Sequence, residues 1–166
     1  ADIAHGLLGP ALAWAAPERQ NASYAELLRK RATAAPVNGA RIRLGTFTDR
    51  AELPEVAVQL EQQLEAAGFI VEQDVREYQH IEADALAGKF DAFVLSRATV
   101  LDSGDPVAYM FSDFACDGSF NISQFCDPAV DAALVRAASV PAGAARRAAI
   151  AAAEALILAS DAAVPL

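Results

Sequence analysis

Lysine, histidine and cysteine are scarce in this chain of 166 residues, and it has no long apolar run. There are two lysines beside eleven arginines, two histidines and two cysteines, and the formal net charge is −9. Nucleic acid and anionic membrane surfaces are therefore not expected as partners, because both bind clustered lysine and arginine. No apolar run reaches the roughly 18 residues that a membrane-spanning helix needs, so direct membrane insertion is not expected.

Several catalytic and cofactor-binding signatures are also absent. The sequence has no Gly-x-Ser-x-Gly nucleophile elbow, no Gly-x-Gly-x-x-Gly fingerprint and no phosphate-binding loop. His5 and His80 have no cysteine or histidine at ligand spacing, so neither a metal site nor a cofactor is predicted. We expect a protein that is not an enzyme, and a small α/β enzyme stays open as an alternative.

What the chain does have is apolar residues, which make up 54 % of it against 21 % charged residues. That balance excludes intrinsic disorder, and the length suits one domain with a sizeable core. Much of the apolar fraction is alanine, and arginine replaces lysine. This composition is typical of a GC-rich genome, so we expect a bacterial source, actinobacterial before proteobacterial.

Strand and helix patterns alternate along the chain and predict an α/β fold. Period-two or continuous apolar segments predict strands at 41–47, 69–72 and 90–95. Helices are predicted after the capping box Ser23-Tyr24-Ala25-Glu26, after an Asp49 cap, at 81–89, after Asp105-Pro106, after Asp127-Pro128 and from Pro141.

The first 20 residues are apolar without a clear period, and we interpret them as an irregular lead-in segment. They begin without methionine, and the last residues are apolar, so we expect the chain to be a fragment of a longer protein. In that case the lead-in packs on missing parts of the parent chain. If the chain is instead a partner-docking module, the same stretch is its interaction surface.

Cys116 and Cys126 enclose a segment with the composition of a loop. An even number of cysteines in an exported protein favours a disulfide, which would stabilise the fold by roughly 3 kcal/mol. Two free buried thiols in a cytosolic protein are the alternative.

The residues after the third predicted strand are the candidate binding loop, since ligands of open α/β sheets bind at the carboxyl ends of strands. Asp105 has a structural role as a helix cap, whereas Asp102 has no obvious one. A carboxylate there can anchor a ligand ammonium group, although Asp102 also suits a simple turn. Arg97 can hold a ligand carboxylate or take part in a surface ion pair.

The order of these motifs resembles the C-terminal lobe of the family 5 extracellular solute-binding proteins, the peptide and nickel receptors of ATP-binding-cassette (ABC) importers. The resemblance runs from about Ser23 to Leu166. It rests on weak motifs in a fairly specific order: Leu53-Pro54-Glu55, Gly68-Phe69-Ile70-Val71, Gly88-Lys89-Phe90-Asp91, Asp102-Ser103-Gly104-Asp105-Pro106, Asn121-Ile122-Ser123-Gln124-Phe125-Cys126-Asp127-Pro128, Arg146-Arg147 and Ala163-Val164-Pro165-Leu166.

The resemblance implies one lobe of a type II periplasmic-binding-protein-like fold, with a mixed sheet flanked by helices. Residues 21–166 would be the C-terminal ligand-binding lobe, and the N-terminal lobe would be absent. Such receptors capture oligopeptides or dipeptides between two lobes and deliver them to permease subunits. The resemblance also implies a Cys116–Cys126 disulfide and makes Asp102 the partner of the peptide ammonium. Arg97, Thr99, Val100 and Asn121 are the other candidate ligand contacts.

One departure concerns the ligand. Many peptide receptors have a tryptophan just after the buried strand, where this chain has Ser96-Arg97-Ala98-Thr99-Val100. A non-peptide ligand therefore stays open: a nickel chelate, an opine, a sugar or an antibiotic-like molecule. The resemblance implies an extracytoplasmic location, either periplasmic or as a cell-surface lipoprotein.

Overall fold

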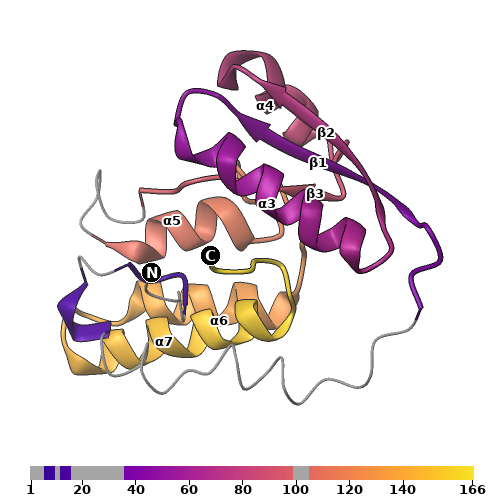
Figure 1. The fold of residues 1–166 in the computed structure, drawn as a ribbon. Coiled ribbons are helices and arrows are strands. Elements are labelled where there is room, and N and C mark those ends of the chain that lie inside the picture. Colours follow the sequence, from indigo (N-terminus) through magenta and orange to yellow (C-terminus); the bar gives the residue numbers. More distant parts are fainter. Residues whose placement is uncertain (1–5, 10–11, 16–35, 99–104) are drawn as a thin grey trace. The chain divides into compact units, whose positions relative to one another are not determined.

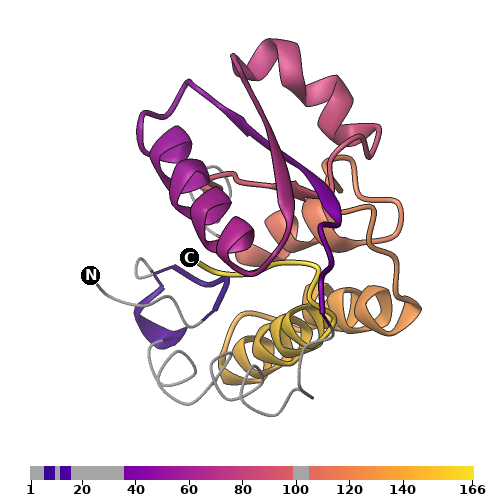
Figure 2. The same ribbon diagram turned by 45° about the vertical axis from the view of Figure 1, so that its right-hand side comes forward.

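The computed structural model describes residues 6–9, 12–15, 36–98 and 105–166 (Figures 1 and 2). The chain divides into two compact units. We call residues 33–97 with 122–124 the sheet unit, and residues 1–32, 98–121 and 125–166 the helical unit. The capping box at Ser23 and the helix predicted after it lie outside the described residues.

The sheet unit contains three strands, β1 (Arg41–Phe47), β2 (Ile70–Arg76) and β3 (Ala92–Phe93), in the order β2-β1-β3. β1 pairs in parallel with β2 from Arg41↔Ile70 to Phe47↔Arg76, and in parallel with β3 at Leu44↔Ala92 and Gly45↔Phe93. The α/β fold class is thereby confirmed. The antiparallel strand that would make the sheet mixed is not among the residues that the structure describes.

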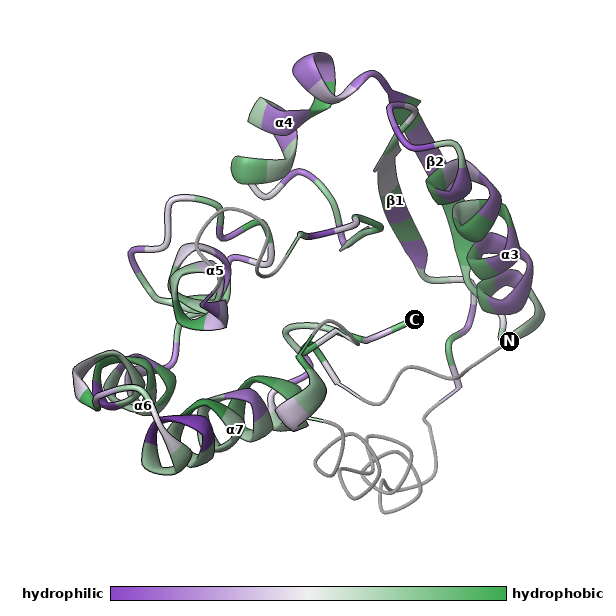
Figure 3. Ribbon diagram, turned by 90° about the vertical axis from the view of Figure 1, so that its left-hand side faces the viewer, coloured by the Kyte–Doolittle hydropathy of each residue, from purple (hydrophilic) through white to green (hydrophobic). Residues whose placement is uncertain are grey.

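Two helices accompany these strands, α3 (Glu52–Ala66) and α4 (Tyr78–Leu86). Hydrophilic and hydrophobic stretches alternate along α3 (Figure 3), in keeping with its predicted amphipathic pattern. Gly68 follows α3 with φ of +101°, the left-handed conformation expected of a glycine that ends a helix. The core of this unit is apolar: Leu44, Phe47, Leu53, Ala57, Val71, Ile81 and Val94.

Four sequence predictions in this unit need correction. The second strand covers Ile70–Arg76 instead of 69–72, and the helix predicted at 81–89 is α4, Tyr78–Leu86. Asp49 does not cap α3, whose N-cap is Ala51. The Asp49 carboxylate instead accepts from the backbone N–H of Tyr78 at 2.7 Å, at the first turn of α4. The third strand covers two residues instead of 90–95. One backbone bond remains on each side of it, from Asp91 N to Arg43 O and from Val94 N to Gly45 O. The other backbone groups pair with side chains: the Asp91 carboxylate accepts from the Arg43 N–H, and the Thr46 hydroxyl donates to the Val94 carbonyl.

The helical unit contains the short 3-10 helix η1 (Ala13–Ala15) and helices α5 (Pro106–Phe114), α6 (Pro128–Ser139) and α7 (Ala144–Ala159). α6 and α7 lie side by side (Figure 1). Both predicted Asp-Pro starts are confirmed: Asp105 accepts from Val107 N at 2.9 Å, and Asp127 accepts from Ala129 N at 2.8 Å.

The last helix begins at Ala144 and not at Pro141 as predicted. A helix starting at Pro141 would use the Val140 carbonyl as its first acceptor. That carbonyl instead accepts from the Arg146 guanidinium at 2.9 Å, and the helical bonds start with Arg147 N to Gly143 O at 3.1 Å.

The described part of the lead-in packs on this chain's own helices, so the expectation that it packs on missing parts is wrong there. Leu8 and Ala15 are fully buried in the core of the helical unit. The buried carboxylate of Glu154, on α7, accepts from the backbone N–H of Leu7 at 2.5 Å and of Leu8 at 3.1 Å. Because Leu8 and Ala15 are buried, they are not available to an interaction surface.

Candidate functional site

The carboxyl ends of the parallel strands meet at one edge of the sheet, because the last residue of β1, Phe47, pairs with the last residue of β2, Arg76. Hydrogen bonds tie the segments that leave this edge. Thr48 N donates to Arg76 O at 3.0 Å, and the buried Thr46 hydroxyl donates to Val94 O at 2.9 Å. The segment after β3 therefore leaves the sheet from a fixed point, which is where ligands of such folds bind.

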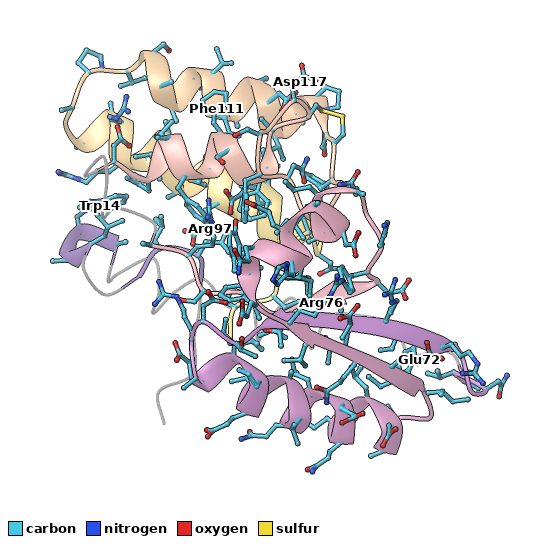
Figure 4. All side chains as sticks on the ribbon, turned by 90° about the horizontal axis from the view of Figure 1, so that it is seen from above. Trp14, Glu72, Arg76, Arg97, Phe111 and Asp117 are labelled. Carbon is cyan, nitrogen blue, oxygen red and sulfur yellow. A yellow bond between two sulfur atoms is a disulfide. The ribbon has the colours of Figure 1, made fainter. Side chains whose placement is uncertain are left out.

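Arg97 lies three residues beyond that fixed point and is exposed; Figure 4 labels it together with Arg76 of β2. Thr99, Val100 and Asp102, the other candidates of this loop, lie outside the described residues. The roles of all four toward a ligand stay predictions.

The next described residue after this loop is Asp105, which an ion pair with Arg146 holds in place. Besides capping α5, the Asp105 carboxylate forms an ion pair with the Arg146 guanidinium. Nη1 of Arg146 also donates to the carbonyls of Ala137, Ala138 and Val140 at 2.7, 3.0 and 2.9 Å. One arginine thus joins the start of α5, the end of α6 and the start of α7, and fixes where the candidate binding loop ends.

The predicted disulfide between Cys116 and Cys126 is confirmed. Within the loop that it closes, the buried Asn121 amide donates to Ala115 O at 3.1 Å and to Phe125 O at 2.6 Å. These bonds give Asn121 a structural role in the loop, and its predicted ligand contact stays a prediction. Asp131 of α6 adds a third tie, accepting from Cys116 N at 3.0 Å.

Gly118, in the same loop, lies against the carboxyl end of α5. A Cβ atom there would come within 2.4 Å of Ser112 O and 2.8 Å of Phe111 O. Both are backbone atoms that a rotamer change cannot move, so only glycine fits this turn. Figure 4 shows Asp117 beside the disulfide.

A chain of ion pairs runs from β1 to α4 in the sheet unit. Asp74 pairs with Arg43 at 2.9 Å and Arg76 at 2.8 Å, and Asp84 pairs with Arg76 at 2.9 Å and Lys89 at 2.6 Å. Hydrogen bonds from Lys89 and then from Arg76 lower the pKa of Asp84 below its usual value. Hydrogen bonds to Asp84 and Asp74 raise the pKa of Arg76. The side chains are partly exposed, so the network adds little stability.

The sequence analysis assigned no structural role to three residues that organise these regions: Arg146, Glu154 and Asp131. A signal did exist for Glu154, since it is the single charged residue in the apolar run Ala148–Ala159 of α7. A lone carboxylate in such a run is typical of a buried polar contact. Arg146 is part of the Arg146-Arg147 motif quoted for the resemblance, and Asp131 had no signal. The contacts of both residues could not be inferred, because their partners lie in other elements.

Metal and membrane sites were also sought in the described ranges. Residues 6–9, 12–15, 36–98 and 105–166 contain no group of three or more histidine, cysteine, aspartate or glutamate side chains that could hold a metal ion. Within the same ranges, none of the helices combines the length and the apolar character needed to cross a membrane.

Neither a protein-family model nor a curated protein sequence matches this chain. Solved structures do match its fold. NikA from Staphylococcus aureus, in complex with Ni(L-His)2, aligns with a TM-score of 0.69 and 18 % identity over 86 % of this chain and 30 % of NikA. The Escherichia coli murein tripeptide binding protein MppA aligns at 0.68 and 22 % identity, over 89 % of this chain and 28 % of MppA.

A third structure adds a peptide complex. The ABC transporter-associated periplasmic binding protein DppA from Helicobacter pylori, in complex with the peptide STSA, aligns with a TM-score of 0.65 and 24 % identity over 78 % of this chain and 25 % of DppA. The chain thus spans less than a third of the length of each protein. At these identities the similarity establishes the fold alone: this chain folds like a part of NikA, MppA and DppA.

Proposed function

We propose that this chain is the C-terminal lobe of a solute-binding protein that captures oligopeptides or dipeptides for an ABC importer. Residues 21–166 would form the lobe, and a second lobe of the longer protein would close the cleft. The observation that carries the proposal is the fold match to MppA and DppA, which are binding proteins by name, and to NikA, which is in complex with Ni(L-His)2. The absence of catalytic motifs from the sequence agrees with binding and release without chemistry.

In this proposal the segment after β3 is the ligand wall. Asp102 pairs with the ammonium group of the peptide, Arg97 takes a carboxylate, and Thr99, Val100 and Asn121 supply further contacts. The exposure of Arg97 at the carboxyl edge of the sheet supports this arrangement. A ligand that contacts both lobes stabilises the closed state by its higher affinity for it, and the permease subunits recognise that state.

The proposed location is extracytoplasmic, in the periplasm or on the cell surface as a lipoprotein. The Cys116–Cys126 disulfide supports it, because disulfides persist in oxidising compartments.

A non-peptide ligand is the second candidate. Two observations favour it: Arg97 is exposed in a segment that lacks an aromatic residue, Ser96–Val100, and the NikA structure holds a nickel–histidine complex. A small chelate or another solute that carries a carboxylate would use the arginine without needing a stacking surface.

Native mass spectrometry of the longer protein, before and after denaturation, tests the proposal. A series of peptide masses supports a peptide receptor, and one discrete non-peptide mass supports the second candidate. In the peptide case, Asp102→Ala should weaken binding by about 2–5 kcal/mol, because it leaves a buried ammonium group unpaired. Glu65→Ala, on the exposed side of α3, is the control and should leave affinity unchanged.

The isolated 166-residue chain should bind such a ligand weakly, because a pocket buries most of its ligand with both walls. Titration calorimetry with the ligand identified in the longer protein measures this. Affinity of the fragment equal to that of the longer protein would contradict the two-lobe arrangement.

A further inference from the structure

An open groove lies on the helical unit between α5, α6 and the disulfide-closed loop. Its volume is about 500 Å³. Ala108, Phe111, Ala115 and Val135 form its apolar lining, and the carboxylate residues Asp117 and Asp131 lie along it. We call it the α5–α6 groove; it lies wholly within one compact unit.

The walls of this groove are held in place by the bonds described above. The disulfide closes the loop, Asp131 accepts from Cys116 N, and Gly118 lies against the backbone end of α5. The groove is therefore formed before anything binds to it, which lowers the ordering cost of an interaction. Val135 nevertheless remains 58 % exposed in the middle of α6, as an apolar contact residue without a partner would be.

The charged residues that line the groove, Asp117 and Asp131, are both acidic. Residues 105–135 contain five aspartates and no lysine, arginine or histidine. Asp105 is paired with Arg146, Asp127 caps α6 and Asp113 is buried. Asp117 is exposed, and its side chain makes no hydrogen bond or ion pair within the part of the chain that the structure describes. The groove thus presents apolar surface in a negative field, which favours a cationic partner.

We propose that the α5–α6 groove docks a segment of a partner protein in which an aliphatic side chain adjoins an arginine or lysine. The aliphatic group covers Phe111 and Val135, and the cation pairs with Asp117. This goes beyond the proposed function, since it assigns a protein-binding surface apart from the solute loop. The groove is too open to bury most of a small ligand. A second copy of the chain is disfavoured, since a two-fold contact through this face brings aspartates together.

The test uses two synthetic peptides with blocked termini, Ac-Ala-Leu-Leu-Arg-Arg-Ala-NH2 and Ac-Ala-Leu-Leu-Glu-Glu-Ala-NH2. Blocking removes the terminal charges that the proposed solute site would hold. Each is titrated into the ¹⁵N-labelled 166-residue chain and followed by amide chemical shifts. The arginine peptide should shift Phe111, Asp117 and Val135 and bind more weakly as salt rises, while the glutamate peptide should not bind.

Two variants locate the interaction. Val135→Glu and Asp117→Lys should each weaken binding of the arginine peptide by about tenfold or more, since each removes one half of the complementarity. Val58→Glu and Glu65→Lys, on the exposed side of α3, make the same changes elsewhere and should have no effect. Both test positions are at the surface, so folding should be preserved, and unchanged shifts of the remaining amides verify it.

Several outcomes would overturn the proposal. These are no shifts with the arginine peptide, equal binding of both peptides, or equal weakening by the α3 variants. Sedimentation that shows a dimer abolished by Val135→Glu would assign the groove to self-association instead. This test does not depend on the solute. If the arginine peptide binds the groove but mass spectrometry finds no solute on the longer protein, the proposed function loses its support while the groove proposal holds.

Discussion

In the sheet unit, backbone ladders join β1 to both of its neighbours, and the ion pairs around Asp74 and Asp84 are partly exposed. In the helical unit, a few polar side chains connect positions far apart in the sequence. Glu154 binds backbone groups 146 and 147 residues away, and Asp105 pairs with Arg146 41 residues away. Both units have an apolar core. The difference teaches that the polar links between elements are single side chains and one disulfide in the helical unit, and repeated backbone bonds in the sheet unit.

The largest expected effect comes from removing the disulfide. Replacing both cysteines, Cys116→Ser with Cys126→Ser, should lower the stability of the helical unit by about 3 kcal/mol, because the unfolded chain regains the entropy of the open loop. Hydrogen exchange under increasing urea measures this residue by residue. Amides of α5 and α6 should lose more protection than those of β1 and β2. An equal loss in both units would contradict the comparison.

Loss of the buried carboxylate is expected to rank second. Glu154→Ala leaves the N–H groups of Leu7 and Leu8 without their acceptor, and should cost about 2–3 kcal/mol. Glu154→Gln keeps a carbonyl oxygen in the same place and should cost less. Urea unfolding measures both variants, and exchange of the Leu7 and Leu8 amides localises the effect. Unchanged protection of these two amides in the alanine variant would show that Glu154 does not hold the lead-in.

The two Asp-Pro helix starts allow a matched comparison inside the helical unit. Asp127 caps α6 alone, so Asp127→Ala should cost about 1 kcal/mol. Asp105 caps α5 and also pairs with Arg146, so Asp105→Ala should cost about 2 kcal/mol, since both contacts are lost. Thermal unfolding of the two variants measures the difference. Equal costs would mean that the Asp105–Arg146 ion pair contributes nothing.

The smallest effect is expected in the sheet unit and concerns pH. The pKa of Asp84 is lowered in the folded chain, so its stabilising contribution is complete above the usual aspartate pKa, near 4. It is lost as the pH falls below that value and through the lowered pKa. Lys89→Ala should raise the pKa of Asp84, because the Lys89 hydrogen bond is the largest cause of the shift.

NMR titration of the Asp84 carboxyl in both proteins measures this change. Glu65→Ala, which removes a charge elsewhere on the sheet unit, serves as control and should leave the Asp84 pKa where it is. A titration of Asp84 that Lys89→Ala does not move would mean that the salt bridge is absent in solution.

Local patterns predicted most of the element positions. The alternation at 41–47 matches β1 residue for residue, and both Asp-Pro pairs begin helices as expected. These signals work because a strand period, a cap and a fixed proline φ depend on neighbouring residues alone. The third strand and the start of α7 could not be predicted, because the Asp91, Thr46 and Arg146 side chains that limit them act across elements.

The candidate site likewise has features that the sequence predicted and contacts that it could not predict. The motif order gave the cysteine pair, which the structure confirms, and placed Arg97 after the third strand. The ligand contact predicted for Asn121 stays a prediction, and the structure adds that its amide donates to Ala115 O and Phe125 O. Spacing cannot reveal such bonds, since an asparagine suits a loop tie and a ligand contact equally well.

By itself, the sequence determined the α/β alternation, the helix starts at Asp105 and Asp127 and the acidic charge, because each depends on composition or on near neighbours. The disulfide was implied by the resemblance, and the residues alone left two free thiols open. Only the tertiary structure decided where the lead-in packs, which carboxylates are used internally and that an apolar groove opens beside Asp117. Those features depend on which distant side chains meet, and folding determines such meetings through the packing of the whole core.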